Sequence, residues 1–294
     1  MVRCLIPGML RTFLIAFGIV ELAVLHSAAA LIELRPVADT TLHQISQSHN
    51  MGGHSHVAVG ITAQGTRSRG LFLFDLSAIP ENAVVTSVTI TFDLQAIPRA
   101  DLIGNSHSIH RVLTAWGEGS KSGNLGAPAT AGEATWLHSA HPATWQTTGG
   151  DFAAEPSATQ VLGPSPGVFT MSSTPALIAD VQSWLADSSR NFGWLLKVTD
   201  ETPTLTARRF SSSETPNGAL LKIEYSASLP ELRFTSIERS GDNVVIRWSG
   251  GRTTAALQRA AAIDGGWIEI SPGNAGEFTE AITGDRAFYR LVEE

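Results

Sequence analysis

The amino-acid sequence predicts an all-β protein: a jelly-roll-type β-sandwich with one short helix, followed by a small β-sandwich domain. Short apolar–polar alternations recur along most of the chain, separated by turns rich in Gly, Pro, Asn and Ser. A single segment spaces its apolar residues as a helix does. Only 16% of the 294 residues are charged, which argues against long charge-rich helices.

Residues 1–30 have the layout of a secretory signal peptide. Arg3 and Arg11 precede an apolar run at residues 13–25, and small residues end the segment at Ala30. The apolar run has 13 residues, whereas crossing a bilayer takes about 20. We therefore expect an exported protein, extracellular or at the cell surface, without a membrane span after signal cleavage.

Residues 31–226 contain the first series of predicted strands. Within 84–92, the apolar residues Val84, Val88, Ile90 and Phe92 fall on one parity and Thr or Ser fills much of the other. One face of that strand should pack and the other should meet solvent. Similar runs occur at 70–74, 108–112, 193–198 and 220–225. Their spacing is typical of a sandwich rather than of alternating strands and helices.

One helix is predicted, at residues 175–187. Thr174 can cap its N-terminus and Pro175 suits the first turn. Leu177, Val181 and Trp184 then recur at helical spacing, so this face should pack on the sheet.

A linker at residues 227–230 precedes a second series of strands in residues 231–294. We expect strands at 232–235, 244–248, 256–259, 267–270 and 287–291. About 65 residues without a disulfide is near the lower limit for an independent core. This domain would serve as a spacer or as a docking unit for a protein partner.

Cysteine content and charge exclude several kinds of function. The single cysteine, Cys4, lies in the predicted signal peptide. The mature chain would then have no disulfide, no Cys-ligated metal and no Cys nucleophile. The net charge is −7 and only three lysines are present, so no nucleic-acid partner is expected.

A series of short motifs occurs in fixed order between residues 31 and 226. The motifs lie at 38–42, 50–53, 69–76, 110–112, 116–119, 134–136, 145–152, 180–184, 191–197 and 210–214. This series resembles DNRLRE-domain proteins, also described as carbohydrate-binding module family 96. The resemblance implies a jelly-roll sandwich and an extracellular polysaccharide-binding or surface module. Acidic polysaccharides such as alginate are among the ligands of that family.

Residues 257–259, 265–267 and 287–291 are similar to segments of small immunoglobulin- or fibronectin-like repeats in exported bacterial proteins. The similarity is short. It implies a spacer role for residues 231–294 and adds nothing about a ligand.

Aromatic side chains are the first candidates for a glycan site, because flat rings stack on sugar faces. Trp116, Trp136 and Trp145 lie in a loop-like stretch rich in Gly, Ser, Thr and His, and Asp151 and His141 could complement them. The alternative is that these tryptophans pack as framework residues, since Trp is usually mostly buried.

A metal site has weaker support. Eight histidines fall between residues 43 and 141, and His54 and His56 would share one face of a strand. They could equally be surface or cross-strand histidines. Calcium could use Asp39, Asn50 and Asp75, but no Asp/Asn cluster with fixed spacing is present. We expect no cofactor, with calcium as the alternative.

Catalysis has no specific signal. Glu118, Glu133, Asp151 and Glu155 could form a carboxylate pair, but nothing distinguishes them from solvated loop acids. The segment 163–167 matches the pattern GxSxG, yet prolines on both sides of its serine exclude a nucleophile elbow.

The sequence therefore predicts an exported, non-catalytic module that binds a polysaccharide or cell-envelope glycan. A structural unit without free-sugar binding is the alternative, and a polysaccharide lyase or hydrolase is a further one. Because the chain is acidic, an acidic glycan would need local pairing with arginines. The candidates are Arg67, Arg69, Arg208 and Arg209.

Overall fold

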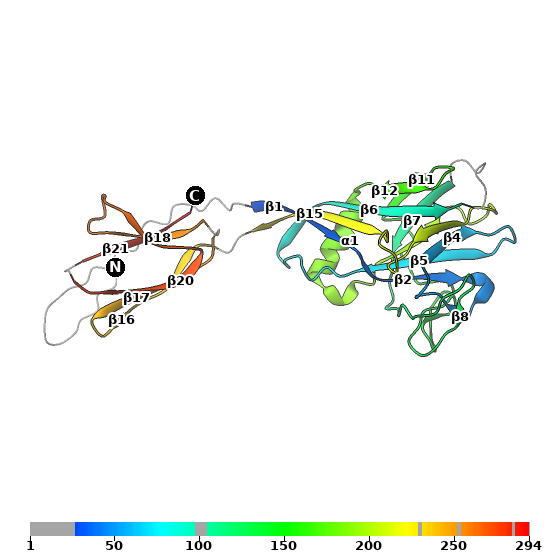
Figure 1. Cartoon of the computed structure of the whole chain (residues 1–294), viewed down its shortest axis with the longest axis horizontal. Helices are drawn as coiled ribbons and strands as arrows, with labels where there is room; N and C mark the ends of the chain where they lie inside the picture. Colours follow the sequence, from blue (N-terminus) through cyan, green and yellow to red (C-terminus); the bar gives the residue numbers. More distant parts are fainter. Residues whose placement is uncertain (1–26, 98–104, 229–230, 252–253, 284–285, 294) are drawn as a thin grey trace. The chain divides into compact units, whose positions relative to one another are not determined.

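The computed structural model describes residues 27–97, 105–228, 231–251, 254–283 and 286–293. It divides into two compact units, one formed by Ala29–Ala227 and the other containing Ser228–Glu294. The chain is mostly β-strand with one α-helix, which confirms the all-β sandwich (Figure 1). Within these described ranges, no helix combines the length and the apolar character needed to cross a membrane.

The first unit is a curled antiparallel sheet folded into two layers, in the strand order β1-β15-β6-β14-β4-β5-β13-β7-β11 (Figure 1). We call one layer the open sheet. It consists of β1 (Ser27–Leu34), β4 (His56–Ile61), β6 (Ala83–Ala96), β12 (Gly167–Met171), β14 (Arg208–Ser211) and β15 (Leu220–Ser228). We call the other layer the covered sheet. It consists of β2 (Pro36–His43), β5 (Arg67–Phe74), β7 (Asn105–Arg111), β11 (Ala158–Leu162) and β13 (Trp194–Val198).

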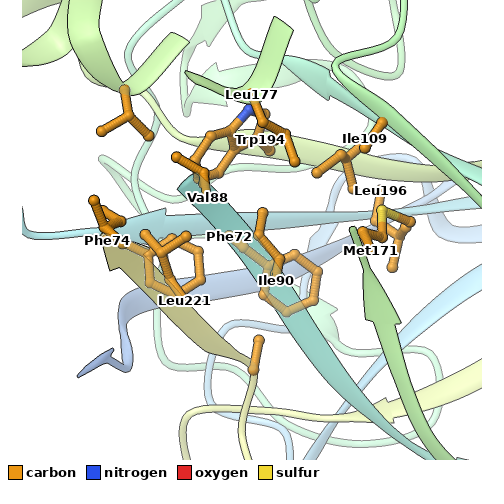
Figure 2. Packing of buried hydrophobic residues seen from close by; sticks show 14 of the residues in the cluster. Phe72, Phe74, Val88, Ile90, Ile109, Met171, Leu177, Trp194, Leu196 and Leu221 are labelled. Carbon is orange, nitrogen blue, oxygen red and sulfur yellow. The ribbon is translucent and has the colours of Figure 1, made fainter. Parts of the chain in front are cut away.

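The main core lies between the two sheets. Alternate residues of every strand point inward, so Phe72 and Trp194 of the covered sheet face Ile90 and Leu221 of the open sheet (Figure 2). These side chains are at most 1% exposed. Burial of such apolar surface is the main favourable contribution to the stability of this unit.

The helix α1 (Pro175–Ala186) begins where the sequence predicts and ends one residue earlier. The Thr174 hydroxyl accepts a 3.0 Å hydrogen bond from the backbone N–H of Leu177, which is the expected N-cap. Leu177, Val181 and Trp184 are buried in the main core, so the predicted packing face is confirmed. A 3₁₀ turn, η2 (Ser188–Arg190), follows.

The predicted parity of β6 is correct in its second half and wrong at its start. Val88, Ile90 and Phe92 are buried, but Val84 is 59% exposed and Val85 is buried instead. The cause is an irregularity in the pairing of β6 with β15, between Glu224 and Tyr225. An extra residue in one strand reverses which side chains face inward.

Residues 113–157, which we call the cover segment, pack on the outer face of the covered sheet. The short strands of this region are β3 (His49–Asn50), β8 (Ala127–Pro128), β9 (His138–Ala140) and β10 (Ala143–Thr144), with the 3₁₀ turn η1 (Gln44–Ser46). A second core of Ala134, Trp136 and Trp145 forms against Leu71 and Leu195. The covered sheet is therefore buried on both faces.

The second unit is a small sandwich of two three-stranded sheets, β16-β17-β20 and β19-β18-β21. The strands are β16 (Arg233–Ser240), β17 (Asn243–Ser249), β18 (Ala256–Ala260), β19 (Ile268–Pro272), β20 (Ala275–Ala281) and β21 (Phe288–Val292). Ile246, Trp248 and Leu257 are its buried core. The sequence analysis missed β20, because Phe278 is its only large apolar residue.

The predicted linker and the predicted start of the mature chain do not coincide with the ends of the observed strands. β15 runs to Ser228, so the first two residues of the predicted linker belong to a strand. β1 begins at Ser27, four residues before Leu31, where the mature chain would start. Residues 1–26 of the predicted signal peptide lie outside the described residues.

Candidate functional site

The three tryptophans predicted to form a platform lie in or beside the second core. Trp136 and Trp145 are each 4% exposed. The indole N–H of Trp145 donates to the carbonyl oxygen of Thr135 at 2.8 Å, and that of half-buried Trp116 donates to Phe192 at 2.9 Å. The faces of Trp136 and Trp145 thus contact protein, which is the packing alternative rather than a sugar platform.

Asp151 and His141, the predicted complements, are also in the cover segment. The Asp151 carboxylate accepts hydrogen bonds from the backbone N–H groups of Gln146 and Thr147, at 2.9 and 2.8 Å, and from the Thr114 hydroxyl. The Asp151 carboxylate therefore stabilises the loop that contains Gln146 and Thr147. His141 contacts His138, with ring centroids 4.7 Å apart. The structure gathers these side chains near the tryptophans, of which Trp136 and Trp145 are buried and Trp116 is half-buried.

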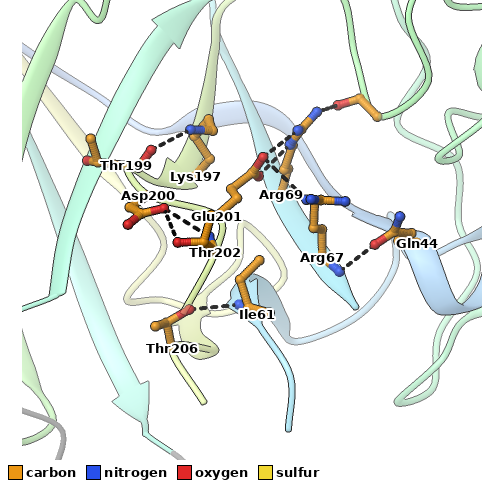
Figure 3. A network of polar contacts seen from close by, with 11 residues as sticks. Gln44, Ile61, Arg67, Arg69, Lys197, Thr199, Asp200, Glu201, Thr202 and Thr206 are labelled. Carbon is orange, nitrogen blue, oxygen red and sulfur yellow. Dashed lines mark hydrogen bonds and ion pairs between the residues drawn. The ribbon is translucent and has the colours of Figure 1, made fainter. Parts of the chain in front are cut away.

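Arg69 is a structural residue that joins the cover segment to the covered sheet. Its guanidinium lies 5.0 Å from the ring of Trp136 and 5.1 Å from that of Phe152. Nε and Nη2 donate to the two carboxylate oxygens of Glu201, at 2.8 and 2.7 Å (Figure 3). Burial opposes ionisation of Glu201, yet the hydrogen bonds and charge of Arg69 lower its pKa.

Room for this arrangement depends on Gly149. Its φ is +88°, and a Cβ there would lie 2.7 Å from both Nη1 of Arg69 and the Trp136 ring. Nη1 instead donates to the carbonyl oxygen of Gly149 at 2.8 Å. Arg67 lies at the margin of the same network, 3.6 Å from Glu201 (Figure 3).

The candidate calcium ligands are not assembled into a site. Asn50 is buried and donates to the carbonyl oxygens of Glu118 and Ala134. Asp75 accepts from its own neighbour Ser77. Asp39 is buried, and this burial raises its pKa to about 7. In the part of the chain that is described, no three His, Cys, Asp or Glu residues are grouped to hold a metal ion.

The outer face of the open sheet carries polar side chains along β4, β6, β12, β14 and β15. The outward positions follow from the register: Arg209 lies opposite Ala58, and Thr170 opposite Thr91. The side chains on this face are exposed or half-buried apart from Ser211, and nearly all are polar. They are His56, Thr89, Thr91, Asp93, Gln95, Val168, Thr170, Arg209, Ser211, Lys222 and Glu224. We call this surface the polar face.

Arg209 is the exposed cation at the centre of the polar face. No hydrogen bond or ion pair joins its guanidinium to another residue among those described. His54 and His56 lie next to it, with their ring centroids 4.2 Å apart. Burial, then the neighbouring His54, then Arg209 lower the pKa of His56 to about 4, so its imidazole is neutral at pH 7.

On the other side of Arg209, a chain of hydrogen bonds crosses the strands. The Gln95 amide donates to the Ser211 hydroxyl at 2.7 Å, and Ser211 donates to the Asp93 carboxylate at 2.8 Å. Lys222 is paired with Glu33 at 2.5 Å. Among the described residues, the polar face therefore combines one cation that has no hydrogen-bond or ion-pair partner with imidazoles, an amide, hydroxyls and the carboxylates of Asp93 and Glu224. Such groups can pair a carboxylate and satisfy sugar hydroxyls.

The sequence analysis named Arg209 among four arginines but missed the polar face. A signal was present in the alternation around it, because Phe210 must point into the core and Arg209 therefore outward. His56 and Gln95 could be found only from the pairing of β14 with β4 and β6, two strands distant in sequence.

No family model matches the chain, and no curated protein matches it. Among solved structures, it is similar to a beta-glucuronidase from Ruminococcus gnavus, with 11% sequence identity and a TM-score of 0.18. The match covers 90% of this chain and 43% of that chain, so this chain spans less than half the length of that enzyme. A TM-score this low supports no conclusion about fold or function.

Proposed function

We propose that the first unit is a non-catalytic module that binds an acidic glycan through the polar face. The observation that carries the proposal is the exposed guanidinium of Arg209 on a polar sheet surface, where no described residue pairs with it. A guanidinium binds a carboxylate through two parallel hydrogen bonds, and the uronate residues of acidic polysaccharides supply carboxylates.

Neighbouring groups support this assignment. His56 lies one strand from Arg209 and offers a neutral ring with donor and acceptor capacity. Gln95 on the adjacent strand β6 offers an amide, and Ser211 on β14 itself offers a hydroxyl. These groups match sugar hydroxyls, which both donate and accept hydrogen bonds. Because the chain carries a net charge of −7, binding must depend on this local cation rather than on long-range attraction.

In this proposal the protein is exported by residues 1–30 and acts outside the cell or on its surface. The second unit serves as a spacer or as a docking site for a protein partner. Neither role requires a cofactor.

Affinity electrophoresis of the full chain tests the proposed function, with alginate and polygalacturonate as acidic glycans and with a neutral β-glucan. We expect retardation by an acidic glycan that increases as salt is lowered. Arg209→Gln should weaken binding at least tenfold. Arg67→Gln removes the same charge from the covered sheet and is the matched control. Equal weakening by both variants would contradict a site at Arg209.

An activity assay tests the non-catalytic part separately. Incubation of the purified chain with the same glycans should yield no new reducing ends and no unsaturated uronates. The appearance of either product would identify an enzyme. Absence of binding to every glycan would favour a structural unit of a surface assembly.

A further inference from the structure

Arg208 and Arg209 are adjacent on β14 and point to opposite sides of the open sheet. Arg209 is exposed, whereas Arg208 points into the sandwich with Phe210 and is only 1% exposed. An arginine is almost never fully buried unless it is paired, because transfer of its charge out of water is costly. The buried guanidinium of Arg208 therefore needs a partner for its charge.

Only one of the three guanidinium nitrogens of Arg208 has a hydrogen-bond partner among the described residues. Nη1 donates to the backbone carbonyl oxygens of Thr206 and Ala207, at 3.4 and 3.2 Å. Nε and Nη2 are buried, and no described residue accepts a hydrogen bond from them. These two nitrogens belong to one edge of the guanidinium, which presents two parallel N–H bonds to a single acceptor group.

Arg69 shows what this edge does when a partner is available. The same two nitrogens, Nε and Nη2, hold the carboxylate of Glu201 (Figure 3). Around Arg208, the inward neighbours are apolar: Val59 lies opposite it on β4, and Leu94 lies opposite Phe210 on β6. Burial lowers the pKa of Arg208, and among the described residues no acidic side chain compensates its charge.

The nearest titratable neighbour does not supply a negative charge either. His107 on β7 is fully buried and contacts Phe210. Its Nδ1 lies 3.2 Å from the carbonyl oxygen of Asn105, and its Nε2 has no partner. Burial, together with the charges of Arg208 and Lys197, lowers the pKa of His107 to about 4 despite the hydrogen bond to Asn105, so the ring is neutral at pH 7. Among the described residues, nothing compensates the positive charge of Arg208 at this point of the interior.

We propose that Arg208 binds a small monovalent anion, chloride in physiological solution, inside the sandwich. The anion accepts the N–H bonds of Nε and Nη2 and neutralises the guanidinium. A halide fits this environment better than phosphate or sulfate, because those ions carry more charge and need more donors than this apolar interior provides. The site is separate from the polar face, and it makes the folding of the first unit dependent on an anion.

Thermal unfolding of the full chain tests the proposal at constant ionic strength, with chloride exchanged stepwise for gluconate. A ligand that binds only the folded state raises Tm with its concentration. We expect Tm of the first unit to rise with chloride, and bromide to replace it. Arg208→Met should abolish the response, and Arg209→Gln, its neighbour on the opposite face, should retain it. An identical Tm in chloride and gluconate would overturn the proposal.

A second measurement does not depend on the folding of Arg208→Met. Crystals of the unchanged chain grown in bromide should show an anomalous peak within hydrogen-bonding distance of Nε and Nη2 of Arg208. A water molecule alone at that position would overturn the proposal.

Discussion

The covered sheet packs apolar side chains on both of its faces, whereas the open sheet packs them on its inner face alone. Leu71 and Leu195 of the covered sheet lie under the cover segment, and Phe72 and Trp194 beside them face the main core. On the open sheet, the outward neighbours of Ile90 and Phe210 are Thr91 and Arg209. One outer face therefore contributes to the stability of the unit, whereas the other is the surface to which we assign the proposed glycan binding.

The largest expected effect is the loss of the cover segment from the covered sheet. Trp145→Ala removes a buried ring and the hydrogen bond to Thr135, so it should lower the free energy of unfolding by about 4 kcal/mol. Urea unfolding monitored by circular dichroism measures this loss. Trp267→Ala, in the second unit, is the control and should leave the transition of the first unit unchanged. A loss below about 1 kcal/mol at Trp145 would contradict its structural role.

Removal of the Arg69 charge should have the next largest effect. Arg69→Met leaves the Glu201 carboxylate half-buried without its bidentate partner, which should cost about 3 kcal/mol. The double variant Arg69→Met with Glu201→Leu should recover part of this loss, since it removes both of these charges and leaves only the more exposed Arg67 without its partner Glu201. If the double variant is less stable than Arg69→Met, the ion pair is not the source of the effect.

Asp39, on β2 of the covered sheet, should make a measurable contribution to the pH dependence of the unfolding free energy. Its pKa is raised to about 7, so the folded state binds more protons than the unfolded state between about pH 4 and 7. Stability from this group is therefore present at low pH and is lost as pH rises through this range. The loss between pH 5 and 7 should be on the order of 2 kcal/mol.

Asp39→Asn isolates this contribution, because the amide oxygen can still accept from the Ser213 backbone. The buried histidines act in the opposite direction: the pKa of His43 is lowered to about 4, so its contribution is lost as pH falls below about 6.5. From pH 5 to pH 7, the unfolding free energy of Asp39→Asn should therefore rise relative to that of the unchanged chain. A constant difference would contradict a raised pKa.

The smallest effect on stability is expected on the polar face. Arg209→Gln should change the free energy of unfolding by less than about 0.5 kcal/mol, because the side chain is exposed and unpaired. The same variant should weaken glycan binding. Destabilisation comparable to that of Arg69→Met would show that Arg209 supports the fold.

Local patterns in the sequence predicted much of the fold. Thr174, Pro175 and the spacing of Leu177 and Val181 define α1, because a cap and an amphipathic face are local properties. Alternation predicted β6 up to the point where its pairing with β15 becomes irregular, which depends on a strand more than 130 residues away. The sequence pattern did not predict strand β20, because this strand has little apolar surface to bury.

The candidate site was less predictable, since residue type does not reveal which face of a sheet is covered. Trp136 and Trp145 suggested a sugar-binding platform, but the cover segment that carries them packs on the covered sheet and buries them. Arg208 and Arg209 are identical residues in sequence and differ only in the side of β14 to which they point. The long-range pairing of strands decides that a buried arginine and an exposed one lie side by side.

The bare outer face of the open sheet also has an evolutionary consequence. Residues such as Thr91, Gln95, Thr170 and Arg209 can be replaced without loss of core packing, since each points away from the interior. If this face binds a glycan as proposed, its specificity can therefore change by substitution of these residues while the inward residues of the same strands stay constant. Because the strands are regularly spaced, these outward positions can be randomised together in combinatorial libraries that are screened for new binding proteins.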